Sequence, residues 1–573
     1  MLFNIEINDR QVSAKRGETI LNVLNRIGIH VPTLCNMSGF TPTGGCRMCV
    51  VEVDGVSGLV PACSHPVEEW MRIKTHSPRV LKARKTLVEL LLASHPDDCL
   101  YCGRSGSCEL QVLALELNIR ERKYLRKRQM VQIDKACAAI ERDPAKCILC
   151  GRCIRVCDEV IGLSAIEVIG RGSHSQIGTS YNKGLNFNHC VKCGQCILVC
   201  PTSALTEKSS YHAVVEALSN PDLHTVIQFS PTVPGSVAEE FGLKTNRDIL
   251  NLFRAALKAI GFRQIYDVSM ACDLTIMEEA AEFIERLNRQ ENLPMFTSCC
   301  PAWVRYVEEL RPNLLPKLST TRSPQQMMGS LIKNYISSSA GVKPENVFVV
   351  SVMPCTAKKH EAENHKMKDG ATRYVDAVIT TRELVSMIRL LGIDFASLDP
   401  EPTDTAFSLR SSAGKLFGIA GGALEGLLRT VNFMMNGQEL NPAKITELRG
   451  LKTRKESRIK IGKQLLNVVS VSGLAGAIAL LQEIEAGRSD IHIVEVMACP
   501  YGCINGGGQR IGTDEKNLKS RMKSIYDVDE EEMIKVAHKN PIIIDLYEKF
   551  LAKPNSERNR ELLHVSRIPT EDK

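Results

Sequence analysis

The chain has 573 residues, roughly three to four times the length of an ordinary domain, so several domains are expected. Hydrophobic residues make up 44% and charged residues 24%, which excludes an intrinsically disordered, fibrous or low-complexity protein. The formal net charge of +7 lies in the first 208 residues, which hold 27 Lys and Arg against 20 Asp and Glu, while the remaining residues hold 45 of each.

The cysteine content is the most informative part of the composition. Of 22 cysteines, 16 lie before residue 201 in short clusters. The start MLFNIEINDRQ has no basic stretch followed by an apolar core, and no apolar run is long enough to span a membrane, so we expect a cytoplasmic protein. In a reducing compartment such cysteines are metal ligands or catalytic groups. The basic N-terminal third then either attracts nucleic acid or an acidic protein, or offsets anionic metal–thiolate sites.

Residues 1–80 are predicted to form a [2Fe–2S] domain of the β-grasp ferredoxin type. The run FNIEI alternates in polarity, Asn8 and Asp9 offer a turn, and residues 11–14 return as a hairpin. Residues 19–27 favour a short helix.

Four cysteines follow this helix at the spacing C-x10-C-x2-C-x13-C. Gly44 and Gly45 supply permissive backbone, so that one loop can wrap a cluster and point amides at its sulfurs. A structural zinc ion is the alternative for four thiolates. The predicted [2Fe–2S] ligands are Cys35, Cys46, Cys49 and Cys63.

Residues 81–136 contain a second cluster, spaced H-x3-C-x2-C-x5-C, after a predicted helix at residues 80–93. Taken alone, one His and three Cys are typical of structural zinc. The cluster lies between iron–sulfur patterns, and a redox-silent ion serves no purpose in an electron path, so a [4Fe–4S] centre is predicted. Its ligands are His95, Cys99, Cys102 and Cys108.

Residues 137–208 contain two copies of C-x2-C-x2-C-x3-C, the run of two-cluster bacterial ferredoxins, in which the fourth Cys of each run ligates the other cluster. One predicted [4Fe–4S] set is Cys147, Cys150, Cys153 and Cys200. The other is Cys190, Cys193, Cys196 and Cys157. The N-terminal third is therefore predicted to hold one [2Fe–2S] and three [4Fe–4S] clusters, which implies an electron donor outside and an electron consumer in the rest of the chain.

Residues 209–573 alternate short β-branched runs with amphipathic helices. This predicts a multidomain α/β chain, with N-terminal α+β ferredoxin-like modules and a catalytic domain of mostly parallel sheets flanked by helices. Three strand-like runs end in the turns TSCCPAW, MPCTAKKHE and EVMACPYGCINGGGQ. These turns are expected to converge, because open α/β sheets place sites at the carboxyl ends of their strands. The triple glycine lacks the context of a phosphate loop and is expected to permit close packing.

These three turns resemble the H-cluster motifs of the [FeFe]-hydrogenases, and the N-terminal clusters are similar to those of the long clostridial members of that family. The resemblance covers essentially the whole chain. It implies a ferredoxin hydrogenase that catalyses 2H⁺ + 2e⁻ ⇌ H₂ at an H-cluster, a [4Fe–4S] cubane joined through one cysteine to a two-iron subsite with CO, cyanide and azadithiolate ligands. The implied partners are ferredoxin or a similar small carrier and the hydrogenase maturation proteins, with no membrane and no nucleic acid.

The family's functional residues are carried over position by position. The implied cubane ligands are Cys300, Cys355, Cys499 and Cys503, with Cys503 as the bridge to the two-iron subsite. Cys299 matches the proton-donating thiol, and Lys358 matches the donor to a cyanide ligand. The implied proton relay is Glu279, Ser319, Glu282 and Arg286. The other matching pocket positions are Pro231, Thr232, Ser323, Gln325, Met353, Phe417 and Met497.

Two further expectations concern the relay and the pocket. Residues 275–290 are predicted to form the relay helix, with a Thr275–Glu278 capping box at its start. Without the resemblance, the Glu residues of such a helix would be read as a solvated face. Ser230 stands where the family often has Ala, and it either adds a donor near the distal iron or bonds its own backbone.

Four remaining features have no assigned chemistry. Cys137 and Cys272 are interpreted as small buried hydrophobes, with a redox or protective role as the alternative for Cys272. Residues 122–128, RKYLRKR, are either a solvated helix face or a docking patch for acidic ferredoxin. Residues 527–573 are interpreted as a helical segment that wraps the catalytic domain.

Three other functions share part of this pattern. An electron-transfer subunit like the large peripheral subunit of respiratory complex I shares the N-terminal clusters but would lack the three C-terminal motifs. A non-enzymatic iron–sulfur assembly protein of the same fold would lack the long cluster chain and the thiol of Cys299. A hydrogen-sensing relative would carry a signalling domain, which we do not find in the sequence.

Overall fold

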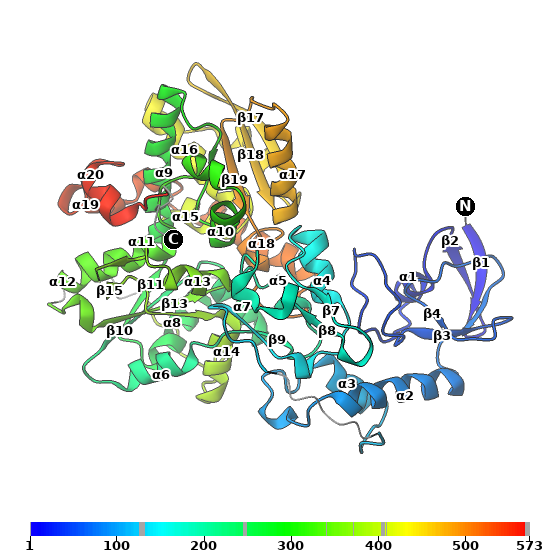
Figure 1. Cartoon of the computed structure of the whole chain (residues 1–573). Coiled ribbons are helices and arrows are strands. Elements are labelled where there is room, and N and C mark those ends of the chain that lie inside the picture. Colours follow the sequence, from blue (N-terminus) through cyan, green and yellow to red (C-terminus); the bar gives the residue numbers. More distant parts are fainter. Residues whose placement is uncertain are drawn as a thin grey trace.

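The computed structural model describes residues 2–567 except 125–131, 244–248, 340, 371, 403–406 and 408. Figure 1 shows the N-terminal sheet set apart at one side, α2 and α3 below it, and two larger sheets with their helices in the main body. No helix in the described part of the chain is long and apolar enough to cross a membrane.

The first unit is a five-stranded sheet with strand order β2-β1-β5-β3-β4, packed against α1 (Ile20–Arg26) around its own hydrophobic core. The strands are β1 (Leu2–Ile7), β2 (Arg10–Lys15), β3 (Val50–Val53), β4 (Val60–Pro61) and β5 (Arg72–Lys74). The predicted hairpin is confirmed, because β1 and β2 pair antiparallel around Asn8 and Asp9, both at positive φ as a two-residue turn requires. The side chain of Thr19 caps α1.

A connecting segment with α2 (Pro78–Ser94) and α3 (Glu109–Glu116) follows. The helix predicted at residues 80–93 is confirmed by α2, which Ser77 caps. The predicted helix face at residues 122–128 is wrong for residues 122–124, which have no helical structure; the Arg122 guanidinium instead pairs with Asp97 and donates to the carbonyl of His95 at 2.9 Å. Residues 125–128 of that prediction lie outside the described residues.

The third unit carries the two cysteine runs on two short helices. Its elements are β6 (Ile140–Arg142), α4 (Arg152–Arg155), β7 (Glu167–Ile169), β8 (Gln176–Gly178), α5 (Gln195–Val199) and β9 (Leu205–Glu207). β6 pairs antiparallel with β9, and β7 with β8. The first and last strands of the unit are therefore neighbours, and α4 contacts α5 between the two runs.

Two four-stranded sheets form the main body. The first has the order β11-β10-β13-β16 and is parallel throughout. In the second, β12-β19-β18-β17, only β17 runs antiparallel. Their strands are β10 (His224–Phe229), β11 (Gln264–Asp267), β12 (Met295–Phe296), β13 (Val347–Met353), β16 (Ala377–Thr380), β17 (Arg454–Ile461), β18 (Gln464–Ser472) and β19 (Ile493–Met497). The chain is thus a multidomain α/β protein with parallel strands, as predicted.

Helix α9 (Ser269–Arg289) joins the cores of the two sheets. Its N-terminal half packs in the core of the first sheet, and its C-terminal half packs in the core of the second. The other helices of the body are α6 (Tyr211–Ser219), α7 (Val233–Glu240), α8 (Ile249–Ile260), α10 (Pro301–Leu310), α11 (Pro324–Leu331), α13 (Ala357–Glu363), α14 (Thr381–Leu390), α15 (Ser412–Leu416), α16 (Gly422–Asn436) and α17 (Leu474–Glu485).

The predicted capping box at Thr275 is wrong. Helix α9 begins six residues earlier, at Ser269, because Asp267 at the end of β11 accepts hydrogen bonds from the backbone N–H and the hydroxyl of Ser269 at 2.9 and 2.6 Å. Thr275 therefore lies inside the helix, where its hydroxyl donates to the carbonyl of Ala271 at 2.9 Å. Cys272, predicted to precede the helix, is also inside it.

The C-terminal segment lies along α9 and α11, as the wrapping interpretation expects. Its helices are α18 (Glu515–Glu531), α19 (Pro541–Lys549) and α20 (Glu557–Leu563). Residue 527 lies inside α18, so it does not mark a structural boundary. After α20 the backbone joins the main body, with Arg322 N–H donating to Leu563 O and Val565 N–H to Thr320 O, each at 2.8 Å.

Candidate active site

The three cysteine-bearing turns converge as the sequence predicts. Cys300 follows β12 and Cys499 follows β19, which are neighbours in the second sheet, while Cys355 follows β13 of the first sheet. Cys503 lies four residues after Cys499, at the start of a short helical turn. All four side chains line one cavity of about 80 Å³ between the two sheets.

The same cavity receives most of the residues carried over by resemblance. Cys299 and Lys358 line it with the four cysteines, as do five further expected positions: Pro231, Gln325, Met353, Phe417 and Met497. Ser230 and Cys272 also line it. Two expected positions, Thr232 and Ser323, do not belong to its lining. The cavity wall is apolar apart from a few convergent polar groups, which is typical of a buried cofactor site.

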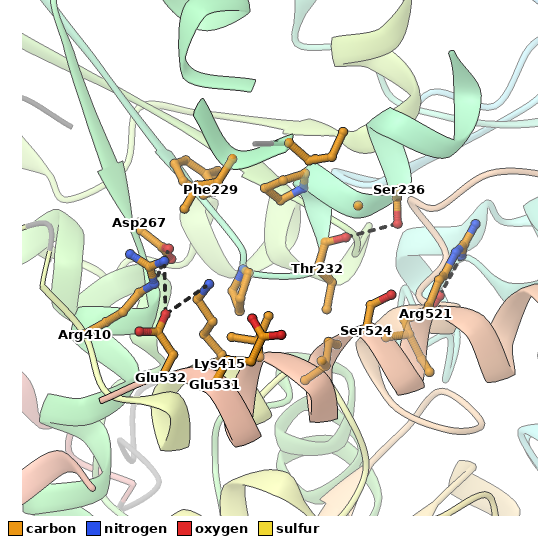
Figure 2. Close-up of a pocket in the computed structure, with 18 of the residues that line it drawn as sticks. Phe229, Thr232, Ser236, Asp267, Arg410, Lys415, Arg521, Ser524, Glu531 and Glu532 are labelled. Atoms are coloured by element: carbon orange, nitrogen blue, oxygen red, sulfur yellow. Dashed lines mark hydrogen bonds and ion pairs between the residues drawn. The ribbon is translucent and has the colours of Figure 1, made fainter. Parts of the chain in front are cut away.

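Thr232 faces a second pocket, of about 380 Å³ (Figure 2), and Pro231 lines both this pocket and the first cavity. The carbonyl of Thr232 accepts the hydroxyl of Ser236 at 3.0 Å, and across the pocket Arg410 pairs with Asp267 at 3.2 Å. The hydroxyls of Ser230 and Thr232 lie 3.3 Å apart. Ser230 therefore bonds a neighbouring side chain at the edge of the first cavity rather than its own backbone.

A buried carboxylate that the sequence analysis missed, Glu361, organises the polar wall of the cavity. Lys358 Nζ donates to its two oxygens at 3.0 and 3.2 Å and to the carbonyl of Cys299 at 3.3 Å. Burial lowers the pKa of Lys358, but the pair with Glu361 raises it more, so the ammonium stays charged. Glu361 also accepts from Ser323 Oγ at 2.9 Å and from Gln325 Nε2 at 3.1 Å. Ser323 thus acts on the cavity through Glu361.

A chain of hydrogen bonds leads from Glu279, near the cavity, to the protein surface. Glu279 accepts from the hydroxyl of Thr321 at 3.0 Å, and the hydroxyls of Thr321 and Ser319 are 2.9 Å apart. Ser319 Oγ then donates to Glu282 at 2.9 Å. All four side chains are buried. The predicted relay residues are therefore adjacent, but Thr321, which was not predicted, lies between Ser319 and Glu279.

Burial sets the protonation behaviour at the inner end of this chain. Burial, with the charge of the neighbouring Glu282 next in importance, raises the pKa of Glu279 to about 7. Burial, with the charge of Glu279 next in importance, also raises the pKa of the Cys299 thiol well above its ordinary value. Cys299 therefore carries a proton at neutral pH, and Glu279 lies close enough to interact with it.

The outer end of the chain is held by Arg286. Its guanidinium donates to Glu282 at 2.6 Å and to the carbonyls of Pro316 and Leu318 at 3.1 and 2.7 Å. Glu282 and Arg286 both line a surface hollow of about 610 Å³. The chain of hydrogen bonds thus reaches the surface at Arg286, the position that the resemblance implies as the exit of the relay.

The third unit groups its eight cysteines in the way the ferredoxin pattern predicts. One small cavity is lined by Cys147, Cys150, Cys153 and Cys200. A second is lined by Cys157, Cys190, Cys193 and Cys196. The fourth cysteine of each run thus faces the other cavity. Cys137, the remaining cysteine of this unit, is buried in the same core.

The N-terminal cysteines are less uniformly arranged. The thiol of Cys35 is in hydrogen-bonding contact with those of Cys46 and Cys63, and Cys49 with that of Cys63, so these four form one group. In the next segment His95 and Cys108 are buried, Cys102 is half-buried, and Cys99 is exposed. Nδ1 of His95 is buried and has no hydrogen-bond partner in the described part of the chain.

Both N-terminal units contact α4 of the third unit. Arg152 pairs with Glu109 at the start of α3 through two bonds of 2.6 and 2.9 Å. Arg155 donates to the carbonyl of Thr41 at 2.7 Å and to that of Cys35. Successive arginines of one helix therefore hold two different N-terminal units.

The third unit packs directly on the cavity loops. Gln195 Nε2 donates to the carbonyl of Asn505 at 2.7 Å, and Thr356 Oγ1 donates to the carbonyl of Lys192 at 2.7 Å. A Cβ atom added at Gly507 would lie 2.1 Å from the carbonyl oxygen of Cys193. The expectation that the glycine run permits close packing is thus confirmed.

Comparison with known proteins covers nearly the whole length of the chain. Residues 223–507 match the C-terminal domain of the iron only hydrogenase large subunit, and residues 515–566 match the iron hydrogenase small subunit. The N-terminal matches are a 2Fe-2S iron-sulfur cluster binding domain (2–78), the NADH-ubiquinone oxidoreductase-G iron-sulfur binding region (84–123) and the ferredoxin-like domain of NADH-quinone oxidoreductase subunit 3 (137–206).

Two curated relatives and one solved structure illustrate the similarity. The NADP-reducing hydrogenase subunit HndD of Solidesulfovibrio fructosivorans is 40% identical, over 98% of each chain. Iron hydrogenase 1 of Clostridium pasteurianum is 36% identical, over 98% of this chain and 99% of its own. A variant of apo [FeFe]-hydrogenase HydA1 from Chlamydomonas reinhardtii is 32% identical, covers 62% of this chain and 98% of its own, and superimposes with a TM-score of 0.56.

Proposed function

Since the chain belongs to the [FeFe]-hydrogenases, with N-terminal iron–sulfur domains, we propose that it catalyses 2H⁺ + 2e⁻ ⇌ H₂ at an H-cluster in the cavity between the two sheets. The observation that carries the proposal is the cavity itself. Four cysteines from three turns meet there, next to the thiol of Cys299, which lies at the inner end of the proposed proton relay. Four soft thiolate donors suit an iron–sulfur cluster. The ligands of its cubane would be Cys300, Cys355, Cys499 and Cys503, with Cys503 as the bridge to the two-iron subsite.

When bound, the H-cluster supplies the redox chemistry and the site of hydrogen formation. The residues of this chain hold and move the proton. Cys299 holds a proton at its thiol and exchanges it with Glu279, and the hydroxyls of Thr321 and Ser319 carry it on to Glu282. Each step needs only a short hydrogen bond and a group that can exist in both protonation states.

The polar wall around Lys358 positions the bound cluster. Its buried ammonium, held by Glu361, is a charged donor facing the cavity, where it would bind a cyanide ligand. Pro231, Gln325, Met353, Phe417 and Met497 shape the apolar remainder and exclude water. Ser323 and Thr232 act from behind this wall, through Glu361 and Ser230 respectively.

Electrons would reach the cavity through four accessory clusters, one [2Fe–2S] and three [4Fe–4S]. We assign residues 1–80 to the [2Fe–2S] domain, 81–136 to the His95 cluster, 137–208 to the two-cluster domain and 209–573 to the catalytic domain. The ligands of the His95 cluster would be His95, Cys99, Cys102 and Cys108. The close approach of Gly507 to the carbonyl of Cys193 supports a last accessory cluster that would lie directly against the catalytic loops.

The electron partner separates two versions of this function. Ferredoxin or a similar small carrier is our first proposal, and the basic N-terminal third suits an acidic carrier. The similarity to an NADP-reducing hydrogenase subunit favours a second version, in which a partner protein links this chain to a nicotinamide cofactor. Measuring H₂ evolution by the isolated chain with reduced ferredoxin decides between them. In the first version the isolated chain accepts electrons from ferredoxin directly, whereas in the second version electron transfer requires the partner protein.

Infrared spectroscopy and H₂ evolution together test the function. Purified protein produced with the hydrogenase maturation proteins should show CO and cyanide stretching bands and evolve H₂ from a small artificial reductant. An electron-transfer subunit would show neither. A hydrogen-sensing relative would show the bands but turn over slowly. Absence of both bands and turnover from a fully matured preparation would refute the proposal.

A further inference from the structure

The hollow at the outer end of the relay is also lined by the C-terminal segment. Its wall combines Glu282 and Arg286 of α9 with Thr320, Arg560 and His564. The hollow opens at the surface and holds about 610 Å³, so water in it reaches both Glu282 and His564. The outer end of the relay therefore meets solvent in a hollow whose walls come from α9 and from the C-terminal segment.

Arg286 is not able to exchange a proton in this hollow. A guanidinium remains protonated at all physiological pH values, and it has donors but no acceptor. Arg286 uses these donors to hold Glu282 and the carbonyls of Pro316 and Leu318. It is thus a positioning residue, and the group that exchanges protons with Glu282 must be another one.

The imidazole of His564 is held rigidly on one side. Its Nε2 lies 3.1 Å from Oε2 of the fully buried Glu278. Glu278 accepts further bonds from the Tyr547 hydroxyl at 2.7 Å, the Asn559 amide at 2.8 Å and the Asn555 N–H at 2.6 Å. Since these three neighbours are donors, Glu278 acts as an acceptor throughout, and Nε2 of His564 carries its proton toward Glu278.

The other ring nitrogen has a partner that suits either protonation state. Nδ1 of His564 lies 2.8 Å from the hydroxyl of Thr320. A hydroxyl can donate to a bare Nδ1 or accept from a protonated one, so the ring gains or loses a proton without moving. The backbone N–H of Thr320 donates to both oxygens of Glu282 at 3.1 Å. Thr320 therefore ties His564 to the last carboxylate of the relay.

We propose that His564 is the proton-exchanging group at the outer end of the relay, working at Nδ1 between Glu282 and the water of the hollow; this rests on the proposed hydrogenase function. During H₂ oxidation the proton leaves the Glu282 carboxyl, crosses water in the hollow and binds Nδ1. The hydroxyl of Thr320 turns to accept from it, and the proton then passes to solvent. During H₂ evolution each transfer runs in reverse. Imidazole suits this task because it changes charge near neutral pH.

Several charged and titratable groups lie near His564 or line the same hollow. Glu278 of α9 contacts the ring, Tyr547 of α19 donates to Glu278, and Glu282 of α9 binds the backbone of Thr320. Arg567 donates to the carbonyls of Ser319 and Thr321 at 2.8 and 3.2 Å. The remaining charged groups of the hollow are Glu285, Arg286, Arg289, Glu291, Glu557, Arg560 and Glu561.

The chain offers a matched control in His538. Its Nε2 also lies 3.1 Å from a carboxylate, Glu439, and its Nδ1 lies 3.3 Å from a threonine hydroxyl, Thr430. It is buried in the same C-terminal segment but stacks on Phe433 and does not line the hollow. Replacing it removes a similar set of bonds without touching the relay.

The first test compares His564→Gln with His538→Gln in the matured enzyme, measuring H₂ evolution from reduced methyl viologen across pH. Glutamine keeps a donor and an acceptor but cannot change protonation. We expect kcat of His564→Gln to fall roughly 10–10²-fold, less than the 10²–10⁴ typical of a group at the reacting atoms, because water offers a bypass. KM for the viologen and the infrared bands should not change. His538→Gln should keep the parent rate and pH profile.

A second variant separates proton transfer from structure. In His564→Ala the volume vacated by the imidazole ring becomes part of the hollow. Imidazole added to the solution can enter it and should restore the rate in proportion to its concentration. Parent-like turnover of both His564 variants, or a loss that imidazole does not rescue and that His538→Gln shares, would overturn the proposal.

Nitrogen NMR of histidine-labelled protein gives a readout that does not depend on turnover. We expect Nε2 of His564 to stay protonated while Nδ1 exchanges its proton with water, and this exchange should slow in Glu282→Gln but not in Glu439→Gln. A neutral ring that carries its proton on Nδ1 would refute the proposal. If the parent made no hydrogen, the proposed function would fail, and the NMR result would still decide which nitrogen exchanges the proton.

Discussion

The hydroxyl of Thr321 lies 3.0 Å from Oε1 of Glu279 and 2.9 Å from the hydroxyl of Ser319. Each hydroxyl has one proton to donate. If Ser319 donates to Glu282 and Thr321 donates to Ser319, then Glu279 must be protonated to donate to Thr321. The order of donors along the chain therefore changes with the protonation of Glu279, whose pKa of about 7 makes both orders accessible near neutral pH.

Replacing Thr321 should interrupt the relay. Thr321→Val keeps the shape of the side chain but removes the hydroxyl between Ser319 and Glu279, so we expect kcat to fall roughly 10²-fold, by analogy with the loss of one proton-transfer group. Thr321→Ser restores the hydroxyl and should restore most of the rate. Turnover of both variants is measured at matched cluster content. Equal rates for Val and Ser would show that protons bypass Thr321.

The pair Cys299 and Cys300 should separate proton transfer from cluster binding. Cys300→Ala removes a proposed cluster ligand, so iron content and the CO and cyanide bands should be lost or altered. Cys299→Ala should leave both intact, while turnover falls by at least the roughly 10²–10⁴-fold typical of general acid–base groups. Cys299→Asp keeps an exchangeable proton and should retain some activity. A Cys299→Ala enzyme with an intact cluster and the parent rate would remove the relay from the mechanism.

The buried carboxyl of Glu279 should make stability depend on pH. Its pKa is raised from 4.5 to about 7, so the stability present at pH below about 4.5 is lost as pH rises through 7, by up to about 3 kcal/mol. Glu279→Gln cannot ionise and should not show this loss. The thermal midpoint of the variant should therefore rise relative to the parent between pH 5 and 8, whereas the exposed control Glu291→Gln should follow the parent. A constant difference between Glu279→Gln and the parent would place the pKa of Glu279 outside this range.

Replacing His95 should change one redox potential. If His95 ligates a [4Fe–4S] cluster, His95→Cys keeps four ligands and adds a negative charge, which disfavours the further negative charge of the reduced state and lowers the potential. EPR-monitored redox titration should show one shifted cluster and the others unchanged. Zinc in the purified protein at one equivalent, or an unaltered set of potentials, would contradict the assignment.

The sequence was sufficient to predict which residues lie together wherever a known motif specifies the partners of its residues. The interleaved ferredoxin runs place Cys200 with Cys147 and Cys157 with Cys190, and the structure groups them in that way. The turns after β12 and β19 converge because parallel strands of one sheet bring their carboxyl ends together, and the turn after β13 meets them from the facing sheet. In these cases the partner is implied by spacing or by strand direction.

Thr321 and Glu361 show what the sequence could not supply. Thr321 reaches Glu279 across 42 residues, and its only local signal is its position two residues after Ser319. Glu361 has a weak signal, its spacing of three from Lys358 on α13, which is more often a surface pair. The predicted capping box at Thr275 was wrong although its local pattern was present. Asp267 binds Ser269, and the helix begins there, six residues before Thr275.

The two arginines of α4 have a consequence for how the N-terminal units are held in place. Arg152 holds the unit that contains His95, and Arg155 holds the loop that contains Cys35. The same two N-terminal units also share a hydrophobic core, in which Leu34 and Met48 pack with Val88 and Leu110. The three N-terminal units therefore brace one another, and loss of either arginine would loosen one of the two contacts that fix the N-terminal pair on the third unit.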